Sequence, residues 1–285
     1  MAQTYIISLS SIPPRFGQLG ATLESLLAQS VPAERVILYL SRQYQRFPQW
    51  DGELPEVPDG VEIRLVDEDY GPATKILPAV RDFAGGDVEI LFCDDDQVYP
   101  KHLARQLLKE RARRPNDVVS VSGMSTYPAM DGERRSIPRP QRLRLWRTTN
   151  LRWQFVRLWR RAKSRYFGVE YVQPTCRLTL RKGYADGLEG FMGVMVRPEF
   201  FPPEVFEIPE FAWSVDDVWL SGHLARSGHK IWITGGLFDP VLTPLRKPSH
   251  LDETALNQNV VGGWERDAAN LETVRFFQRT YGIWD

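Results

Sequence analysis

Short, continuously apolar runs alternate with helix-like segments over the first 123 residues, and this alternation constrains the fold more than any other feature of the sequence. Runs such as "RVILYL" (35–40) are typical of strands that are buried on both faces of a parallel sheet. The segments between the runs repeat apolar residues at helical spacing, as Leu19, Leu23, Leu26 and Leu27 do. The order β-α-β-β-α-β-α-β predicts an α/β fold with a mostly parallel sheet flanked by helices. Strands are expected at 4–12, 35–40, 61–66, 88–93 and 117–123, and helices at 18–30, 72–83 and 101–114.

The second half of the chain continues with fewer clear elements. Strands are expected at 176–180, 190–196 and 230–234, a helix near 216–228, and a polar C-terminal part after them. The sequence contains no repeat and no convincing linker, so the 285 residues are predicted to form a single domain. Its expected parts are a first half at 1–125, a basic insertion at 126–170 and a second half at 171–285.

Composition excludes several classes of protein. With 42% hydrophobic and 25% charged residues, the chain resembles a soluble globular enzyme. Cys93 and Cys176 are its only cysteines, so no disulfide framework is expected and a reducing, cytoplasmic setting is predicted. The first residues lack a basic region followed by a long apolar stretch, so no signal peptide is predicted. No run approaches the roughly 18–20 apolar residues that a membrane span requires.

Three consecutive aspartates, Asp94 to Asp96, follow the expected strand at 88–93. Carboxylates packed this tightly repel one another and need either water or a cation. A second acidic group follows the strand at 61–66 and consists of Asp67, Glu68 and Asp69. Because the carboxyl ends of parallel strands meet at one edge of a sheet, both groups are expected beside one ligand site. A hard cation such as Mg²⁺ or Mn²⁺ could bind there and bridge to a diphosphate.

The motif "CDDDQVYP" makes the chain resemble the GT-A-type glycosyltransferases, the nucleotide-sugar-dependent class that includes the large family 2 group. Asp94 and Asp96 fit the two carboxylates of the Asp-x-Asp motif of that class. Further matching pieces follow in the same order over roughly residues 4 to 250, whereas 128–170 matches nothing in the class. These pieces are "ISLSSIPPRF", "DEDYGPATKILPAV", "GLEGFMGVMVRPEFF" and "SVDDVWLSGHLARSG".

The resemblance implies a metal-dependent transfer, with inversion, of a sugar from a nucleotide-diphosphate donor to a hydroxyl of a saccharide or lipid-linked saccharide. Residues 1–125 would bind the nucleotide sugar, and 171–285 would bind the acceptor. Mn²⁺ or Mg²⁺ would be held by Asp94, Asp96 and His250, and Arg246 and Lys247 would neutralise the diphosphate. The donor would contact Ser8, Ser10, Arg15, Asp67, Asp69, Lys75, Asp94 and Asp95, and the acceptor Glu189, Gly190 and Phe191.

The resemblance also places the catalytic base in the acidic pair Asp216-Asp217, with Asp217 preferred and Asp216 in reserve. The competing interpretation is a helix start, because Ser214-Val-Asp-Asp217 resembles a capping box. Ordinary alternatives exist for the other candidates as well. They are an exposed Arg15, turn-forming acids at Asp67 and Asp69, a solvated Lys75, a glycine-rich turn at 187–193 and a surface His250.

Residues 134–169 hold twelve Arg or Lys and no acid, which leaves the remainder of the chain with a net charge of −12. Within this segment, 150–167 is predicted to be an amphipathic helix with Leu151, Phe155, Leu158, Trp159, Ala162 and Tyr166 on one face. Such a helix suits the surface of an anionic membrane, here through 150–166, and would make the protein peripheral on the inner face. Alternatively, the helix packs on the acidic body. Nucleic acid is not expected as a partner, because no recognisable binding module accompanies the charge.

Two other functional classes remain open. A sugar nucleotidyltransferase also combines an α/β sheet with metal-binding acids, but such enzymes usually carry a glycine-rich and basic loop after the first strand. The segment "SLSSIPPRFGQLG" is a poor match to that loop. The non-enzymatic alternative is an inactive membrane- or glycan-binding protein with the GT-A fold, and the intact acidic groups argue against it.

Overall fold

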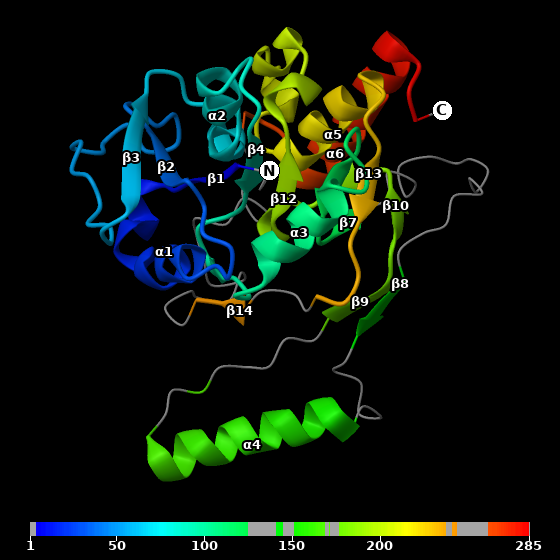
Figure 1. Ribbon diagram of the computed structural model, residues 1–285. Helices are drawn as coiled ribbons and strands as arrows, with labels where there is room; N and C mark the ends of the chain where they lie inside the picture. The colour runs from blue at the N-terminus through cyan, green and yellow to red at the C-terminus, as the bar shows by residue number, and fades with distance from the viewer. Residues whose placement is uncertain are drawn as a thin grey trace.

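The computed structural model describes residues 4–124, 141–144, 151–168, 171, 177–237, 241–243 and 262–284. Its centre is an eight-stranded sheet in the order β10-β13-β6-β12-β4-β1-β2-β3 (Figure 1). Six of these strands run in one direction, and β12 and β10 run in the other. The predicted α/β fold with a mostly parallel sheet is therefore confirmed. The bounds are β1 Tyr5–Ser10, β2 Arg35–Ser41, β3 Val61–Val66, β4 Glu89–Phe92, β6 Val118–Ser120, β10 Gly183–Ala185, β12 Val194–Val196 and β13 Ile231–Ile233.

Helices cover both faces of the sheet, and each face has its own hydrophobic core. Successive residues of a strand point to opposite faces, so Ile6 belongs to one core and Ile7 to the other. Helices α1 (Gly20–Leu27) and α3 (Leu103–Arg111) fill one core. The other is filled by α2 (Leu77–Asp82), α5 (Asp216–Arg226) and α6 (Arg266–Tyr281). Strands buried on both sides explain the continuously apolar runs of the sequence.

Two expected elements differ from the structure because of local backbone geometry. The helix expected at 72–83 is divided into a 3-10 turn, η2 (Gly71–Lys75), and the short helix α2. The strand expected at 190–196 begins as the 3-10 turn η4 (Gly190–Met192). Gly193, with φ of 97°, then turns the chain into β12. A positive φ costs glycine little, but it interrupts the extended backbone of a strand. The strand β12 therefore begins only after Gly193.

Helix α6 lies in the part of the chain that was expected only to be polar. It packs on α5 through Phe277, which is fully buried. The contact needs Gly222, because a Cβ atom there would lie 2.3 Å from the Phe277 ring. Helix α6 therefore completes the second core and brings its first residue, Arg266, to the pocket described below.

In the part of the chain that the structure describes, three pairs of short strands lie outside the main sheet. The strand β5 (Gln97–Val98) pairs with β14 (Val241–Leu242), and β7 (Gly123–Met124) with β11 (Gly187–Leu188). The third pair, β8 (Gln141–Arg144) with β9 (Arg177–Arg181), lies between the body and the helix at Leu151–Phe167 (Figure 1). Among the described residues, the other 3-10 turns are η1 Pro13–Gln18, η5 Pro198–Phe200, η6 Pro203–Phe206 and η7 Glu210–Ala212.

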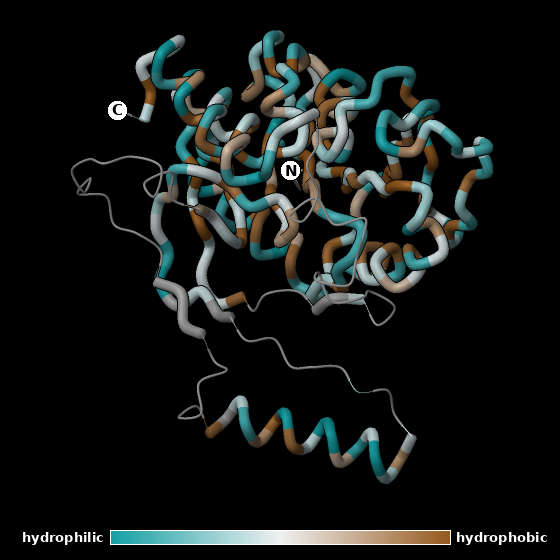
Figure 2. Tube along the Cα trace, turned by 180° about the vertical axis from the view of Figure 1, so that it is seen from behind, coloured by the Kyte–Doolittle hydropathy of each residue, from teal (hydrophilic) through white to brown (hydrophobic). Residues whose placement is uncertain are grey.

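The basic insertion contains the predicted helix, α4 (Leu151–Phe167). It lies apart from the body (Figures 1 and 2). Its apolar residues are exposed, with Phe155 at 69% and Leu158 at 58%. The alternative in which this face packs on the acidic body is therefore wrong for the structure. Within the described residues, every helix is too short or too polar to cross a bilayer.

A buried ion pair joins α3 to the start of β4. Glu89 and Arg111 each expose only 1% of their side chains, and two hydrogen bonds of 2.8 Å connect them. Arg111 also donates to the carbonyl oxygens of Arg114 and Asp117, at 2.7 and 2.5 Å. The guanidinium group thus holds the turn that leads into β6.

Candidate active site

A pocket of about 440 Å³ opens at the carboxyl ends of β1 and β4, which are the neighbouring parallel strands at the centre of the sheet. In sheets of this kind, ligands bind beyond the carboxyl ends of the strands. Six carboxyl groups and four cationic groups line the pocket. The acids are Asp69, Asp94, Asp95, Asp96, Asp216 and Asp217, and the cations are Arg15, Arg46, Lys75 and Arg266.

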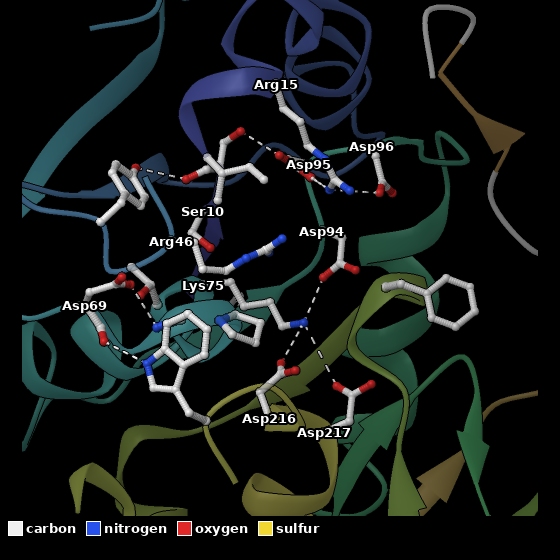
Figure 3. Close-up of a pocket in the computed structure, with 18 of the residues that line it drawn as sticks. Ser10, Arg15, Arg46, Asp69, Lys75, Asp94, Asp95, Asp96, Asp216 and Asp217 are labelled. Carbon is white, nitrogen blue, oxygen red and sulfur yellow. Dashed lines mark hydrogen bonds and ion pairs between the residues drawn. The ribbon is translucent and has the colours of Figure 1, made fainter. Parts of the chain in front are cut away.

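Lys75 lies among three of these acids (Figure 3). Its Nζ is 2.8 Å from Asp94 Oδ1, 2.9 Å from Asp216 Oδ2 and 3.9 Å from Asp217 Oδ1. The lysine exposes 6% of its side chain, so the alternative of a solvated helix lysine is wrong. Three elements meet at this ammonium group, because Lys75 ends η2, Asp94 follows β4, and the acidic pair opens α5.

Burial and neighbouring charges together determine the protonation of this cluster. Burial of Lys75 would lower its pKa, but Asp216, Asp94 and Asp217 raise that pKa well above its usual value, so the ammonium stays charged. Burial raises the pKa of Asp217 to about 8, and the adjacent charge of Asp216 acts in the same direction. Lys75 and the Gly190 N–H oppose that increase. A carboxyl group with a pKa near neutrality is suited to exchange protons with a substrate.

The capping-box interpretation of Ser214 to Asp217 is wrong. The N-cap of α5 is Val215, and no side chain makes a capping hydrogen bond there. Asp217 Oδ1 instead accepts a hydrogen bond of 3.0 Å from the backbone N–H of Gly190. A Cβ atom at Gly190 would lie 2.7 Å from Lys75 Nζ and 2.9 Å from Asp217 Oδ1, so the backbone can approach this closely only at a glycine.

The repulsion among the three consecutive aspartates is relieved by protein cations. Asp94 pairs with Lys75, whereas Asp95 and Asp96 share Arg15, whose Nη1 lies 3.0 Å from Asp95 Oδ1 and 3.3 Å from Asp96 Oδ2. The Ser11 hydroxyl also donates to Asp95, at 2.5 Å. Arg15 exposes 19% of its side chain, so it is part of the pocket wall and not a free surface residue.

Asp69 and an aromatic side chain form another part of the wall. Asp69 Oδ1 accepts a hydrogen bond of 2.9 Å from the Gly71 N–H, which is the turn expected before Gly71-Pro72. Its backbone oxygen accepts a hydrogen bond of 3.1 Å from Trp213 Nε1. A Cβ atom at Gly71 would lie 2.7 Å from the Trp213 ring, so glycine lets the indole lie against the turn. Both roles of Asp69, in the turn and in the pocket, are thus compatible.

The structure does not bring every candidate to the pocket. Ser8 is fully buried inside β1, where its hydroxyl donates to the Lys75 carbonyl at 2.6 Å. Asp67 follows the edge strand β3 and pairs with Arg42 in solvent, with 93% of its side chain exposed. Glu189 accepts a hydrogen bond from the Ser122 hydroxyl beside the pocket. Ser10 and Phe191 do line the pocket.

Arg246, Lys247 and His250 lie outside the described residues, so their expected roles remain predictions. Within the described part of the chain, no group of three or more His, Cys, Asp or Glu side chains is arranged as a metal site. The oxygen donors expected for Mg²⁺ or Mn²⁺ are nevertheless in the pocket, because Asp94 and Asp96 both line it.

Sequence reasoning missed several pocket residues. Arg46 and Phe47 follow β2, Trp213 follows η7, and Arg266 is the first residue of α6. Arg46 and Phe47 could have been predicted as pocket residues, because they follow β2, which lies beside β1 and ends at the same edge of the sheet. No local signal identifies Trp213 or Arg266, which depend on how the second half folds over the sheet.

Comparisons with known proteins give a likeness in structure alone. No model of a known protein family matches the chain, and no curated protein matches it either. The structure of S. aureus TarS residues 1–349 in complex with UDP aligns at 12% identity with a TM-score of 0.41, over 82% of this chain and 59% of that one. A second structure of TarS 1–349 aligns at 13% identity and the same TM-score and coverage. The chain spans less than two thirds of these structures, and likeness at this level says nothing about activity.

Proposed function

We propose that this protein is a metal-dependent glycosyltransferase. It moves a sugar, with inversion, from a nucleotide-diphosphate donor to a hydroxyl of a saccharide or of a lipid-linked saccharide. The observation that supports this most is the buried cluster of Lys75, Asp94, Asp216 and Asp217 at the carboxyl ends of the central strands. The cluster combines a carboxyl group of raised pKa with two further carboxylates and a buried lysine, which are the groups that the reaction requires.

In the reaction, Asp217 is the base. Its carboxylate accepts the proton of the acceptor hydroxyl while that oxygen forms a bond to the anomeric carbon of the donor. The bond from the anomeric carbon to the diphosphate breaks, and the nucleoside diphosphate leaves with the electron pair. The Gly190 N–H and Lys75 hold Asp217 in place, since both lie against its Oδ1 atom.

The pocket has groups for both parts of the donor. Arg46 and Arg266 line it and are the proposed partners of the diphosphate, together with Arg246 and Lys247 if the C-terminal part reaches the site. Trp213, Tyr44 and Phe47 give apolar surface for the base or the sugar. Asp69 is the proposed partner of the base or ribose, and Phe191 of the acceptor.

Mg²⁺ or Mn²⁺ fits the donor set of this pocket. Mg²⁺ is commonly held by one or two carboxylates together with substrate phosphate oxygens, and Asp94 and Asp96 supply such carboxylates. A bound metal would stabilise the negative charge that develops on the leaving diphosphate.

The proposal is tested with a panel of nucleotide sugars. Thermal shift with and without Mn²⁺ identifies the donor, and the products formed with that donor then distinguish the enzyme classes. Release of a nucleoside diphosphate with a transferred or hydrolysed sugar supports the glycosyltransferase. Formation of pyrophosphate from a nucleoside triphosphate and a sugar phosphate would instead show a sugar nucleotidyltransferase, and binding without turnover would indicate an inactive relative.

Replacing Asp96 should remove the effect of the metal. In Asp96→Ala, nucleotide affinity in Mn²⁺ is expected to fall by at least about tenfold, because a direct metal ligand is lost. Titration calorimetry with and without Mn²⁺ measures this. The fold should persist, because Arg15 keeps its contact with Asp95. Asp67→Ala, which removes an exposed acid outside the pocket, is the matched control and should behave as wild type. Full activity in chelator would exclude the metal.

Gly190→Ala should damage catalysis more than folding. The new methyl group would displace Lys75 Nζ or Asp217 Oδ1, and misplacement of a reacting group by about 1 Å can cost roughly 100-fold in rate. We expect turnover to fall on that scale, measured by steady-state kinetics. Gly20→Ala is the control, since nothing lies within 4 Å of its Cβ position. Wild-type turnover in Gly190→Ala would show that the cluster tolerates movement.

A further inference from the structure

The exposed face of α4 is its apolar face. Six large apolar side chains on this helix are exposed, between 55% for Trp159 and 79% for Leu151. At about 100° per residue, the last of them, Phe167, lies apart, and the other five fall within an arc of about 100°. They are Leu151, Phe155, Leu158, Trp159 and Tyr166. A helix solvated by water is expected to hide such an arc and expose its polar residues, so this surface requires a partner.

The other side of α4 is the covered one. Trp153 points away from the apolar arc and exposes only 6% of its surface, with the Arg157 guanidinium 5.3 Å from its ring centre. The Arg161 guanidinium lies 5.6 Å from the ring of Tyr171, outside the helix. These contacts fix which side of α4 faces outward, and they leave the apolar arc open.

Basic residues border the apolar arc on both sides. Arg161 and Arg165 follow one edge on the helical wheel, and Lys163 follows the other. Lys163 Nζ lies 5.6 Å from the centre of the Trp159 ring, and all three basic residues are exposed. An apolar stripe between two basic borders lets the rings enter a bilayer while the charged ends of the long side chains remain at the lipid phosphates.

We propose that α4 binds to the surface of an anionic membrane, with its axis in the plane of the interface and its apolar arc among the acyl chains. The helix is too short and too charged to span a bilayer. A second copy of the same helix is a poor partner, because 134–169 carries twelve basic residues and no acid. A nucleic acid would satisfy the charge but would leave the apolar arc in water.

The charge of the rest of the molecule fixes the orientation. Outside 134–169 the chain has a net charge of −12, so an anionic surface repels the body and attracts the insertion. The two views of the molecule place α4 apart from the body, on the side of β8, β9 and β14 (Figures 1 and 2). The strand β14 pairs with β5, directly after Asp96. Membrane contact through α4 would therefore hold this side of the body toward the lipid.

The test is co-sedimentation of the full chain with vesicles, and its readout does not require enzymatic activity. Vesicles of phosphatidylglycerol and phosphatidylcholine are compared with vesicles of phosphatidylcholine alone, each at low and high salt. We expect binding to the anionic vesicles at low salt and weaker binding at high salt, because exposed charges are screened beyond about 8–10 Å. Absence of binding at low salt, or equal binding to both kinds of vesicle, would overturn the proposal.

Paired variants separate insertion from attraction by charge alone. Phe155→Ser with Trp159→Ser keeps every charge, and we expect the partition coefficient to fall at least about tenfold because apolar burial is lost. Leu54→Ser, at an exposed apolar residue of the body, should bind as wild type. Unchanged binding of the double variant would show adsorption by charge only and overturn the proposal. A protein that sediments as a dimer, becomes monomeric in the double variant and ignores vesicles would assign the arc to self-association instead.

Discussion

Asp217→Asn is expected to lower turnover by about 10²–10⁴, the usual contribution of a positioned base, with little change in donor affinity. The amide keeps the size of the side chain and can occupy the same place beside Gly190 and Lys75, but it cannot accept the proton. Steady-state kinetics and nucleotide binding on the same preparation measure the two quantities. Asp267→Asn, an exposed acid in the first turn of α6, removes a charge at a similar helix position and should leave turnover unchanged.

The pH dependence gives an independent check on this role. Because the pKa of Asp217 is about 8 and the base must be deprotonated, kcat/KM of the wild type should rise about tenfold per pH unit below that value and level off above it. The ascending limb should be absent from the residual activity of Asp217→Asn. If the limb persists, or if turnover is near wild type, Asp216 or Glu189 becomes the candidate base.

Stability should respond to pH in the opposite direction. The pKa of Asp217 rises from 3.8 to about 8 on folding, so between these values the folded state holds a proton that the unfolded state has lost. The free energy of unfolding is then expected to fall as pH rises through this range. Asp217→Asn imitates the protonated form and should reduce that slope, which urea unfolding at several pH values measures.

Arg111→Met should destabilise the fold by about 3–5 kcal/mol, because it removes the cation that pairs with the buried carboxylate of Glu89. The carbonyl oxygens of Arg114 and Asp117 lose a donor as well. Urea denaturation of the variant measures the loss. Arg35→Met is the matched control, since the Arg35–Glu62 pair is 47% and 42% exposed, and it should cost less than about 1 kcal/mol.

A double variant identifies the source of the loss. Glu89→Met together with Arg111→Met removes both charges, and we expect it to recover much of the stability, because the main penalty is a buried carboxylate that has lost its cation. If the double variant is as unstable as Arg111→Met, the hydrogen bonds to the turn before β6 are the more important contribution.

The first half of the fold could be predicted from sequence because each strand there is a local signal. Runs such as 35–40 and 61–66 need only be apolar and short, and they coincide with β2 and β3. The direction of β12 could not be predicted in this way, since it depends on the turn at Gly193. Helix α6 was missed because its buried contacts, such as Phe277 on Gly222, are separated by polar residues.

The positions of the candidate site residues could be predicted where acidic residues follow a strand or open a helix. Asp94 to Asp96 and the pair Asp216-Asp217 come together as expected, but the grouping is organised by Lys75, whose burial the sequence did not indicate. Ser8 lies two residues too deep in β1, and Asp67 follows an edge strand that points to solvent. Arg266 reaches the pocket only through the packing of α6, a long-range effect that no local pattern encodes.

The position of β12 has a consequence for how the chain acquires its structure. Val194 pairs with both Phe92 and Ser120, so a late strand separates two earlier ones in the finished sheet. Until the ribosome has released residue 196, β4 and β6 each have an open edge and cannot pair with each other in the native arrangement. Closing contacts over about a hundred residues is slow, and open edges favour aggregation. Nascent chains that stall within the basic insertion are therefore expected to depend on chaperones.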